Sequence, residues 1–596
     1  YQELKDFFPE NSVHYFVSYY DYYQPEAYIP HTDTYIEKDS KINEEIDRLR
    51  HAATQALVSR DDVIIVASVS CIYNLGSPEE YKNMSFHVFE GQKISLADFV
   101  KSVAKLQYAK DYEIKRGGFR NTKDEVEIFS SDGTTLHKVI FSGGAGKNKV
   151  FKLYRASVSH PDDVESEKPE YQRVLEANIF PAKYWLAPDD KIGIAIENIK
   201  SELQKSIRDL KKKDKVMEAE RLTQKTLFDL RLIKETGYCH GIENYSRHLD
   251  FRKPGAPPFT LLDFFKTKGD FLTIIDESHI TLPQIKGMHR GDRSRKETLV
   301  EYGFRLPSAL DNRPLRFEEF EKRTGRTVYV SATPSKHELK KSGKRGLVEQ
   351  LVRPTGLLDP TIQLKESEKQ IDHLIGEIKK RIASGERVLV TTLTKRMAED
   401  LSEYLAEAGI KVNYIHSEIK TLERLEIIKG LRTGQYDALV GVNLLREGLD
   451  LPEVSLIAIL DADKEGFLRN ATTLIQTMGR AARHINGHII LYADKVTRSM
   501  KAAIDETSRR RKIQKEYNLK NNITPQSIKK AIKDYDLPMK RKTEKVYDDI
   551  SEMAAWYDIS EAVKRLEKTM AKAVKQMDFE TALMLREQIL RLKKKN

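Results

Sequence analysis

The sequence holds only two cysteines among its 596 residues, Cys71 and Cys239. They lie far apart without the spacing of metal ligands, which argues against a disulfide framework and a zinc site and suits the reducing cytoplasm. No apolar run reaches the roughly 18 residues that a membrane-spanning helix needs, and no signal peptide is recognisable. We therefore expect a cytoplasmic protein with no membrane partner.

The net positive charge is concentrated at the end of the chain. The formal net charge is +11, but residues 501–596 hold 24 Lys and Arg against 15 Asp and Glu. The first 500 residues are nearly neutral, so a nucleic-acid site there must be argued from individual residues and not from a global field. At this length the chain forms several domains, because single cores stop growing near about 250–300 residues.

Between Asn11 and Glu37 the chain has no lysine or arginine, but it is rich in tyrosine. Pro25 and Pro30 exclude a helix, and the flanking aromatic residues predict a protruding β-hairpin at about residues 15–42. Exposed rings without positive charge suit stacking on bases or wedging between strands. A hairpin whose rings fill the protein's own core is an equally open alternative. The tyrosines are Tyr15, Tyr19, Tyr20, Tyr22, Tyr23, Tyr28 and Tyr35.

A phosphate-binding loop of the form G-x-x-x-x-G-K-[ST] occurs nowhere in the sequence. The glycine-rich stretch 143–148 contains Lys147, but no Ser or Thr follows this lysine and the first glycine of the motif is misplaced. We interpret the stretch as a hairpin tip.

Two carboxylates follow an apolar run that ends at Ile275, namely Asp276 and Glu277. The run predicts a buried strand, and polar residues at the C-terminal end of such a strand lie where α/β sheets bind ligands. Asp276 could hold Mg²⁺ through its water shell, and Glu277 could polarise an attacking water. The alternative is a helix N-cap followed by a first-turn acid.

Polar turns follow two later apolar strands. The first turn runs from Gly441 to Asp450, and the second opens a helix carrying Arg480 and Arg483. Side chains three residues apart share a helix face, so both guanidinium groups could point at one polyanion. The alternative is a pair of arginines on a solvated face.

These turns resemble motifs of superfamily 2 helicases, together with Ser331-Ala-Thr333 after the strand 327–330. The sequences of residues 16–30 and 444–450 are much more specific than these general helicase motifs. They resemble the UvrB family of the bacterial UvrABC nucleotide-excision repair system. The resemblance covers essentially the whole chain and is densest at 11–81, 237–334 and 384–500.

The resemblance implies an α/β fold with two RecA-like helicase lobes, an inserted α+β module, the β-hairpin and a C-terminal helical hairpin. We expect the rest of the first lobe in residues 1–84, the module in 85–190, and a helical insert with the remainder of the first lobe in 191–355. The second lobe follows in 356–500, then a flexible basic linker in 501–555. Apolar stripes in 556–596 predict the helical hairpin, which packs on a partner or alternatively caps the main body.

The resemblance also implies the function: a damage-verifying, DNA-dependent ATPase that uses ATP and Mg²⁺, is loaded by UvrA and recruits the UvrC nuclease. Its module would dock UvrA, with Arg116, Phe119 and Arg120 in the matching segment. Its tail would contact UvrC, UvrA or its own copy. The residues expected to act in catalysis are Asp276, Glu277, Arg480 and Arg483. Those expected to bind nucleotide are Gly441, Asp450, Arg480 and Arg483, and Asp276 is expected to hold the metal. The residues expected to probe damaged DNA are Tyr19, Tyr20, Tyr22, Tyr23, Tyr28 and Tyr35.

The resembled family carries its phosphate-binding loop upstream of the matched region, and this chain opens on Tyr1. We therefore expect an N-terminal truncation, and a polypeptide that by itself binds ATP poorly and does not hydrolyse it. Two other functions fit less well: a transcription–repair coupling factor or related DNA translocase, and a non-catalytic DNA-binding scaffold.

Overall fold

The computed structural model describes residues 1–142, 149–158, 169–184, 189–416, 419, 421–442 and 451–528. The chain divides into a unit of Tyr1–Ile532 and a unit of Lys533–Asn596. The expected helical hairpin of 556–596 and the expected hairpin tip of 143–148 lie outside the described residues. Within those residues, no helix is both long enough and apolar enough to cross a membrane.

The second lobe is built on a six-stranded parallel sheet with the order β17-β22-β21-β18-β20-β19. Alternate residues of its central strands point to opposite faces. On one face Val388 and Leu456 pack with helices α12 (Gln370–Ala383) and α13 (Lys395–Glu407). On the other, Leu389 and Ile457 pack with α14 (Thr421–Thr433), α15 (Ala471–Gly479) and α16 (Arg498–Asn521). The strands are β17 (Thr361–Lys365), β18 (Arg387–Thr392), β19 (Val412–Ile415), β20 (Ala438–Val442), β21 (Val454–Ile459) and β22 (His488–Tyr492).

Helix α16 corrects the expected linker, because 501–521 are helical and not flexible. Its buried side chains include Met500 and Ala503, which join the core of the second lobe. Gln514 is fully buried, and its amide accepts from the Arg353 N–H (2.6 Å) and donates to the Arg353 carbonyl (3.2 Å). Only a narrow face of this helix is buried, and the many Lys and Arg residues of the segment make that face difficult to recognise in the sequence.

The first lobe contains two separate parallel ladders, β1 (Ser12–Phe16) with β6 (Val63–Ala67) and β15 (Leu272–Ile275) with β16 (Arg326–Tyr329). The sequence predicted that β15 is buried, which is wrong. Strand β6 is half-buried, and Leu272 and Ile274 of β15 are 59% and 63% exposed. Each of these strands pairs with a single other strand among the described residues.

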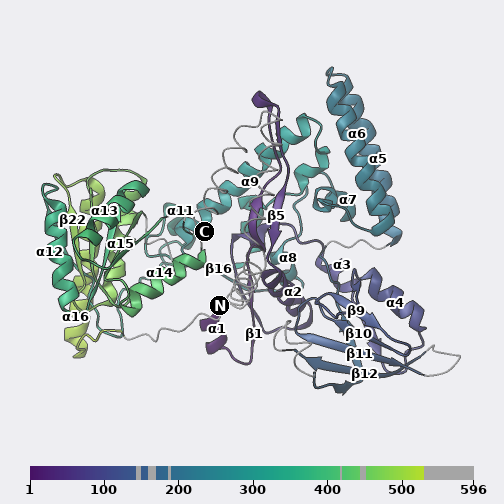
Figure 1. Cartoon of the computed structure of the whole chain (residues 1–596), viewed down its shortest axis with the longest axis horizontal. Helices are drawn as coiled ribbons and strands as arrows, with labels where there is room; N and C mark the ends of the chain where they lie inside the picture. The colour runs from purple at the N-terminus through teal and green to yellow at the C-terminus, as the bar shows by residue number, and fades with distance from the viewer. Residues whose placement is uncertain are drawn as a thin grey trace, which may run out of the picture. The chain divides into compact units, whose positions relative to one another are not determined.

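The inserted module contains a six-stranded sheet with the order β13-β12-β11-β10-β9-β8, and helix α4 (Leu96–Lys105) packs on it. The short ladder of β7 (Phe86–Phe89) with β14 (Glu176–Ile179) adjoins this core. The sheet strands are β8 (Ala109–Lys110), β9 (Gly118–Asn121), β10 (Glu125–Phe129), β11 (Thr135–Phe141), β12 (Val150–Ser157) and β13 (Gln172–Val174). Two long helices follow, α5 (Asp189–Lys211) and α6 (Val216–Thr236), and they pack side by side (Figure 1).

The tyrosine-rich segment forms the predicted antiparallel ribbon. Strand β2 (Tyr20–Gln24) pairs with β5 (Asp39–Ile42), and β3 (Ala27–Ile29) pairs with β4 (Thr34–Ile36). The ribbon runs beside the long helix α9 (Ser278–Glu301), as Figure 1 shows. The Arg295 guanidinium of α9 donates to the Glu26 carbonyl at 2.6 Å. The ribbon is therefore fastened to the helix that begins directly after the two predicted catalytic acids.

Candidate functional site

The turn that follows β15 carries both predicted acids. Asp276 is exposed, and Glu277 stands at the N-cap of α9 in the left-handed region, with φ of 43°. A non-glycine residue in this region is uncommon and marks a constrained position. The Glu277 side chain makes no capping hydrogen bond, and its Oε2 lies 3.6 Å from Nδ1 of His279. The Glu277 carboxylate thus faces His279 and does not cap the helix, which argues against the helix-cap alternative.

The strand that leads into Ser331-Ala-Thr333 lies directly beside this turn. The Ser278 N–H donates to the Val330 carbonyl at 3.0 Å, and the Ser278 hydroxyl donates to Glu338 at 3.1 Å. The Glu338 carboxylate also accepts from the hydroxyl of Ser335. Although burial opposes ionisation, these hydrogen bonds lower the pKa of Glu338. Two segments about 50 residues apart in sequence thus form one polar framework.

His279 joins this framework to the second lobe. Its side chain is only 5% exposed; Nδ1 lies 2.7 Å from the Ser331 hydroxyl, and Nε2 lies 2.7 Å from the amide of Gln476. A neutral imidazole that donates from Nδ1 and accepts at Nε2 satisfies both contacts. Gln476 precedes Arg480 by four residues. Neither His279 nor Gln476 was predicted from the sequence as a site residue, although Gln476 lies one turn before the arginines.

The two predicted arginines do not lie on an α-helix. Helix α15 ends at Gly479, and Arg480–Arg483 form a 3₁₀ turn, η7. Side chains three residues apart eclipse one another in a 3₁₀ turn, so Arg480 and Arg483 still share one face although the turn is not α-helical. Both side chains are half-buried. Gly441 lies inside β20 between β18 and β19, and Asp450 lies outside the described residues.

Magnesium would have one protein ligand at this turn. No group of three His, Cys, Asp or Glu side chains that could hold a metal ion occurs in the described parts of the chain. Mg²⁺ is commonly bound by one or two carboxylates together with water and substrate phosphates. The exposed Asp276 carboxylate fits that mode, so the residues present are compatible with Mg²⁺.

The tyrosines of the ribbon base form a continuous aromatic stack. Tyr19 and Tyr20 lie 4.3 Å apart by ring centroids, with hydroxyls 3.1 Å apart, and Tyr20 stacks on Tyr23 at 4.7 Å. Burial raises the pKa of Tyr20 to about 12. The Tyr23 side chain is 48% exposed and ends the stack, so it offers a free ring surface. Tyr22 pairs with Lys41 in the ladder, and its side chain lies outside the described residues.

Tyr28 and Tyr35 pack against Phe304, in line with the alternative that rings of the hairpin pack on the protein itself. Tyr35 stacks on Phe304 at 4.5 Å, and Tyr28 lies 4.9 Å from the same ring. The Tyr28 hydroxyl donates to Asp33 at 2.6 Å, and the Tyr35 hydroxyl donates to Glu26 at 2.6 Å. These two rings anchor the outer part of the ribbon.

The three module residues of the sequence analysis differ in exposure. Phe119 is 2% exposed in the module core, so its expected role as a contact residue is wrong. Arg116 is largely buried and bridges Asp47 and the Ser131 carbonyl, both at 2.9 Å. Only Arg120 presents a half-exposed guanidinium, which pairs with Glu127 at 2.6 Å.

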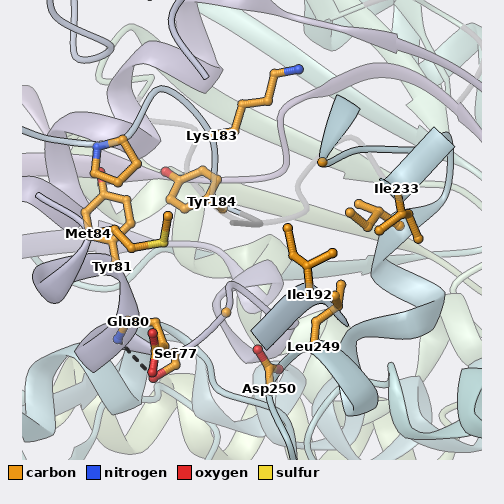
Figure 2. A pocket seen from close by; sticks show the side chains of 14 residues that line it. Ser77, Glu80, Tyr81, Met84, Lys183, Tyr184, Ile192, Ile233, Leu249 and Asp250 are labelled. Atoms are coloured by element: carbon orange, nitrogen blue, oxygen red, sulfur yellow. Dashed lines mark hydrogen bonds between the residues drawn. The ribbon is translucent and has the colours of Figure 1, made fainter. Parts of the chain in front are cut away.

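A small cavity lies where α3 (Pro78–Asn83), α5 and residues 181–184 meet, apart from all these residues (Figure 2). Its volume is about 20 Å³, room for one water. Figure 2 shows Tyr81, Tyr184 and Met84 across from Ile192, Ile233 and Leu249. Burial raises the pKa of Asp250, at its edge, to about 6 in spite of Arg252. The cavity is a small packing defect between these segments, and it has no room for a nucleotide.

Family models match four parts of the chain. They describe the UvrB third helical domain (residues 190–251), the helicase conserved C-terminal domain (369–485), ultra-violet resistance protein B (491–533) and the UvrB/uvrC motif (560–595). The UvrABC system protein B of Geobacillus kaustophilus (strain HTA426) is 54% identical over 597 residues, which cover 100% of this chain and 88% of that protein. This chain belongs to the UvrABC system protein B family.

Two further UvrB proteins are similar to this chain over its whole length. That of Bacillus caldotenax is 54% identical over 596 residues, and that of Staphylococcus aureus (strain Mu50 / ATCC 700699) is 52% identical over 598. In both, the alignment covers 100% of this chain and 88% of the relative. The UvrB family model at 491–533 covers the sequence of α16. The helicase-like α/β fold expected from the sequence is confirmed.

Proposed function

We propose that this UvrB-family chain is the damage-verifying, DNA-dependent ATPase component of bacterial nucleotide excision repair. One observation carries the proposal: helix α9 begins at the two acids and holds the tyrosine ribbon near its other end. A helix of 24 residues spans about 36 Å. In this proposal, a displacement of the end of α9 that carries the acids moves the ribbon, and this couples ATP to DNA.

Each polar residue of the site has a role in this proposal. Asp276 would hold Mg²⁺, and Glu277 would polarise the attacking water. Arg480 and Arg483 would stabilise negative charge on the transferring phosphoryl group. The contact between His279 and Gln476 supports this assignment, because it joins the element of the acids to the helix that leads to the arginines. Closure of the lobes would then complete the site.

The ATPase assignment is tested by turnover. The 596 residues contain no phosphate-binding loop, so we expect this polypeptide to bind ATP weakly and to show no steady-state hydrolysis. In a family member that contains the loop, Arg480→Ala should lower kcat by 100-fold or more, roughly the cost of one transition-state donor, with little change in ATP affinity. Normal turnover by this polypeptide, or by Arg480→Ala, would contradict the assignment.

The DNA assignment is tested at the ribbon. Tyr22→Ala with Tyr23→Ala should weaken retention on damaged duplex at least tenfold, since each stacked base contributes about 1–3 kcal/mol. UvrA binding, measured on the same variant, should be unchanged. Tyr404→Ala on α13 is a matched control, because Tyr404 is 49% exposed and Tyr23 is 48% exposed. Equal loss of DNA retention and UvrA binding would show that the tyrosines are structural.

The partners belong to the same proposal. The module would dock UvrA, and Arg120 is the module arginine whose exposure supports a contact. The segment matched by the UvrB/uvrC motif, 560–595, would bind UvrC or a second copy of the chain. Such a role in DNA repair places the protein in the bacterial cytoplasm.

A further inference from the structure

Helix α9 carries a dense run of positive charge next to a ribbon that has almost none. Residues 286–296 contain five Lys and Arg side chains and a single carboxylate, Asp292. The ribbon has no Lys or Arg from Asn11 to Glu37. Stacked rings do not neutralise phosphates, so a DNA partner of the ribbon needs cations from a neighbouring element.

Two of the five cations are used inside the protein. Arg295 bonds the Glu26 carbonyl at 2.6 Å and Asp292 at 2.8 Å. Lys296 is 6% exposed and pairs with Asp292 at 3.0 Å. These contacts fasten the ribbon and neutralise the only carboxylate of the run.

The other three cations, Lys286, Arg290 and Arg293, are exposed. They are spaced four and three residues apart, so they lie along one face of α9, roughly opposite Arg295, which follows Lys286 by nine residues. Among the described residues Arg290 has no hydrogen-bond or ion-pair partner, and Lys286 lies 4.3 Å over the ring of Phe317. Arg293 pairs only with Glu297, a surface contact in which both side chains are about half exposed. Such a pair is worth about 0–1 kcal/mol and exchanges readily for a phosphate.

The surroundings of this face are also positive. His289 lies between Lys286 and Arg290, and its pKa is lowered by burial and then by Arg313 and Arg316. Arg313 is neutralised by Glu319 at 2.7 Å, whereas Arg316 is exposed at the start of the next helix, α10 (Phe317–Arg323). The potential over this face of α9 therefore favours an anion.

We propose that Lys286, Arg290 and Arg293 form a phosphate-binding strip that holds the DNA backbone while the tyrosine ribbon contacts the bases. The inference rests on the proposed DNA-binding function and extends it. From Lys286 to Arg293 the helix rises about 10 Å, which is about three of the 3.4 Å intervals between successive phosphates along one strand of duplex DNA. The strip thus adds positive charge to that of the ribbon, whose residues 20–42 contain Lys38, paired with Glu243 at 2.9 Å, and Lys41.

The experiment compares two triple variants of the 596-residue chain on a fluorescein-labelled duplex with one bulky adduct and on its undamaged counterpart. The first is Lys286→Gln, Arg290→Gln, Arg293→Gln. The second, a control with the same loss of charge, is Lys211→Gln, Lys212→Gln, Lys213→Gln, at the exposed end of α5. Affinity is measured over a range of salt concentrations.

We expect the strip variant to bind both duplexes more weakly and the slope of log K against log salt to fall by about 2.7, since each duplex phosphate contributes about 0.9. The α5 variant should keep the slope of the unmodified chain. Tyr23→Ala should lose affinity with an unchanged slope. An unchanged slope in the strip variant, or equal losses in the two triple variants, would overturn the strip. Failure of the unmodified chain to bind either duplex even when UvrA is added would instead remove the proposed function itself.

Discussion

At the scale of single residues, Glu26 is the carboxylate on which the ribbon depends. It accepts from Arg305 at 2.7 Å, from the Tyr35 hydroxyl at 2.6 Å and from Lys225 at 3.2 Å. Glu26 and Arg305 are each 7% exposed. Burial alone would raise the pKa of Glu26, but the Arg305 guanidinium and the other donors outweigh it and lower the pKa to about 2. The ribbon is thus held by a buried ion pair that has several further partners.

Replacing Glu26 with Gln should release the ribbon, because Arg305 is then left buried without its counter-ion at a cost of about 3–5 kcal/mol. We expect trypsin to cleave at Lys38 and Lys41 of the variant much faster than in the unmodified chain. Asp33→Asn, which alters only the exposed hydrogen bond to Tyr28, serves as control. Equal cleavage rates in all three proteins would argue against the ion pair as the fastening.

The same residue predicts a dependence on pH. The pKa of Glu26 falls from its ordinary value of 4.5 to about 2, so its stabilisation is present above about pH 4.5 and is lost as the pH falls toward 2. Between about pH 5 and pH 3 the unmodified chain should lose ribbon protection, measured by proteolysis with pepsin, more steeply than Glu26→Gln. Parallel profiles for the two proteins would show that another group governs the acid response.

At the scale of elements, Phe304 is the platform on which the outer ribbon rests. Its ring, 8% exposed, contacts both Tyr28 and Tyr35, and the Arg221 guanidinium lies 4.3 Å from it. Aromatic pairs contribute about 0.5–1.5 kcal/mol each beyond the area they bury. The strand pair β3–β4 is short, and an isolated two-stranded hairpin is marginally stable in water. The platform therefore decides whether this part of the ribbon is ordered.

Phe304→Ala should free residues 27–36 while the second lobe remains unchanged. The loss of two ring contacts, about 1–3 kcal/mol in total, corresponds to amide hydrogen exchange roughly tenfold faster or more in this segment. Phe228→Ala is the control, since Phe228 lies 61% exposed on α6. Unchanged exchange at 27–36 in Phe304→Ala would show that the ladders hold the ribbon unaided.

At the scale of the whole molecule, His279 and Gln476 connect the two lobes across 197 residues of sequence. We expect His279→Ala and Gln476→Ala, in a family member that hydrolyses ATP, each to lower kcat about tenfold. The double variant should be no worse than the single ones, because removal of either partner leaves the other without its contact. Gln204→Ala, at an exposed glutamine of α5, should be neutral. Additive losses would mean that the two residues act separately.

Much of the fold could be predicted from local pattern. The second lobe alternates apolar strands with amphipathic helices. Particular residues also mark the helix ends: Thr394 caps the start of α13, and Gly409, with φ of 80°, follows its end. Helix α16 was missed because its buried face is narrow and its composition is basic. Strand β15 was expected to be buried, but an apolar run indicates burial only when a neighbouring element covers it.

The sequence by itself determined the order of the elements, the tyrosine ribbon and the polar turns after the strands, since these depend on periodicity and turn chemistry within a few residues. Only the tertiary structure decided that Phe119 is buried and that Tyr28 and Tyr35 rest on Phe304. It alone decided that His279 meets Gln476. These contacts join residues from separate elements, some of them hundreds of residues apart, and they form because folding buries complementary surfaces that leave no trace in the local pattern.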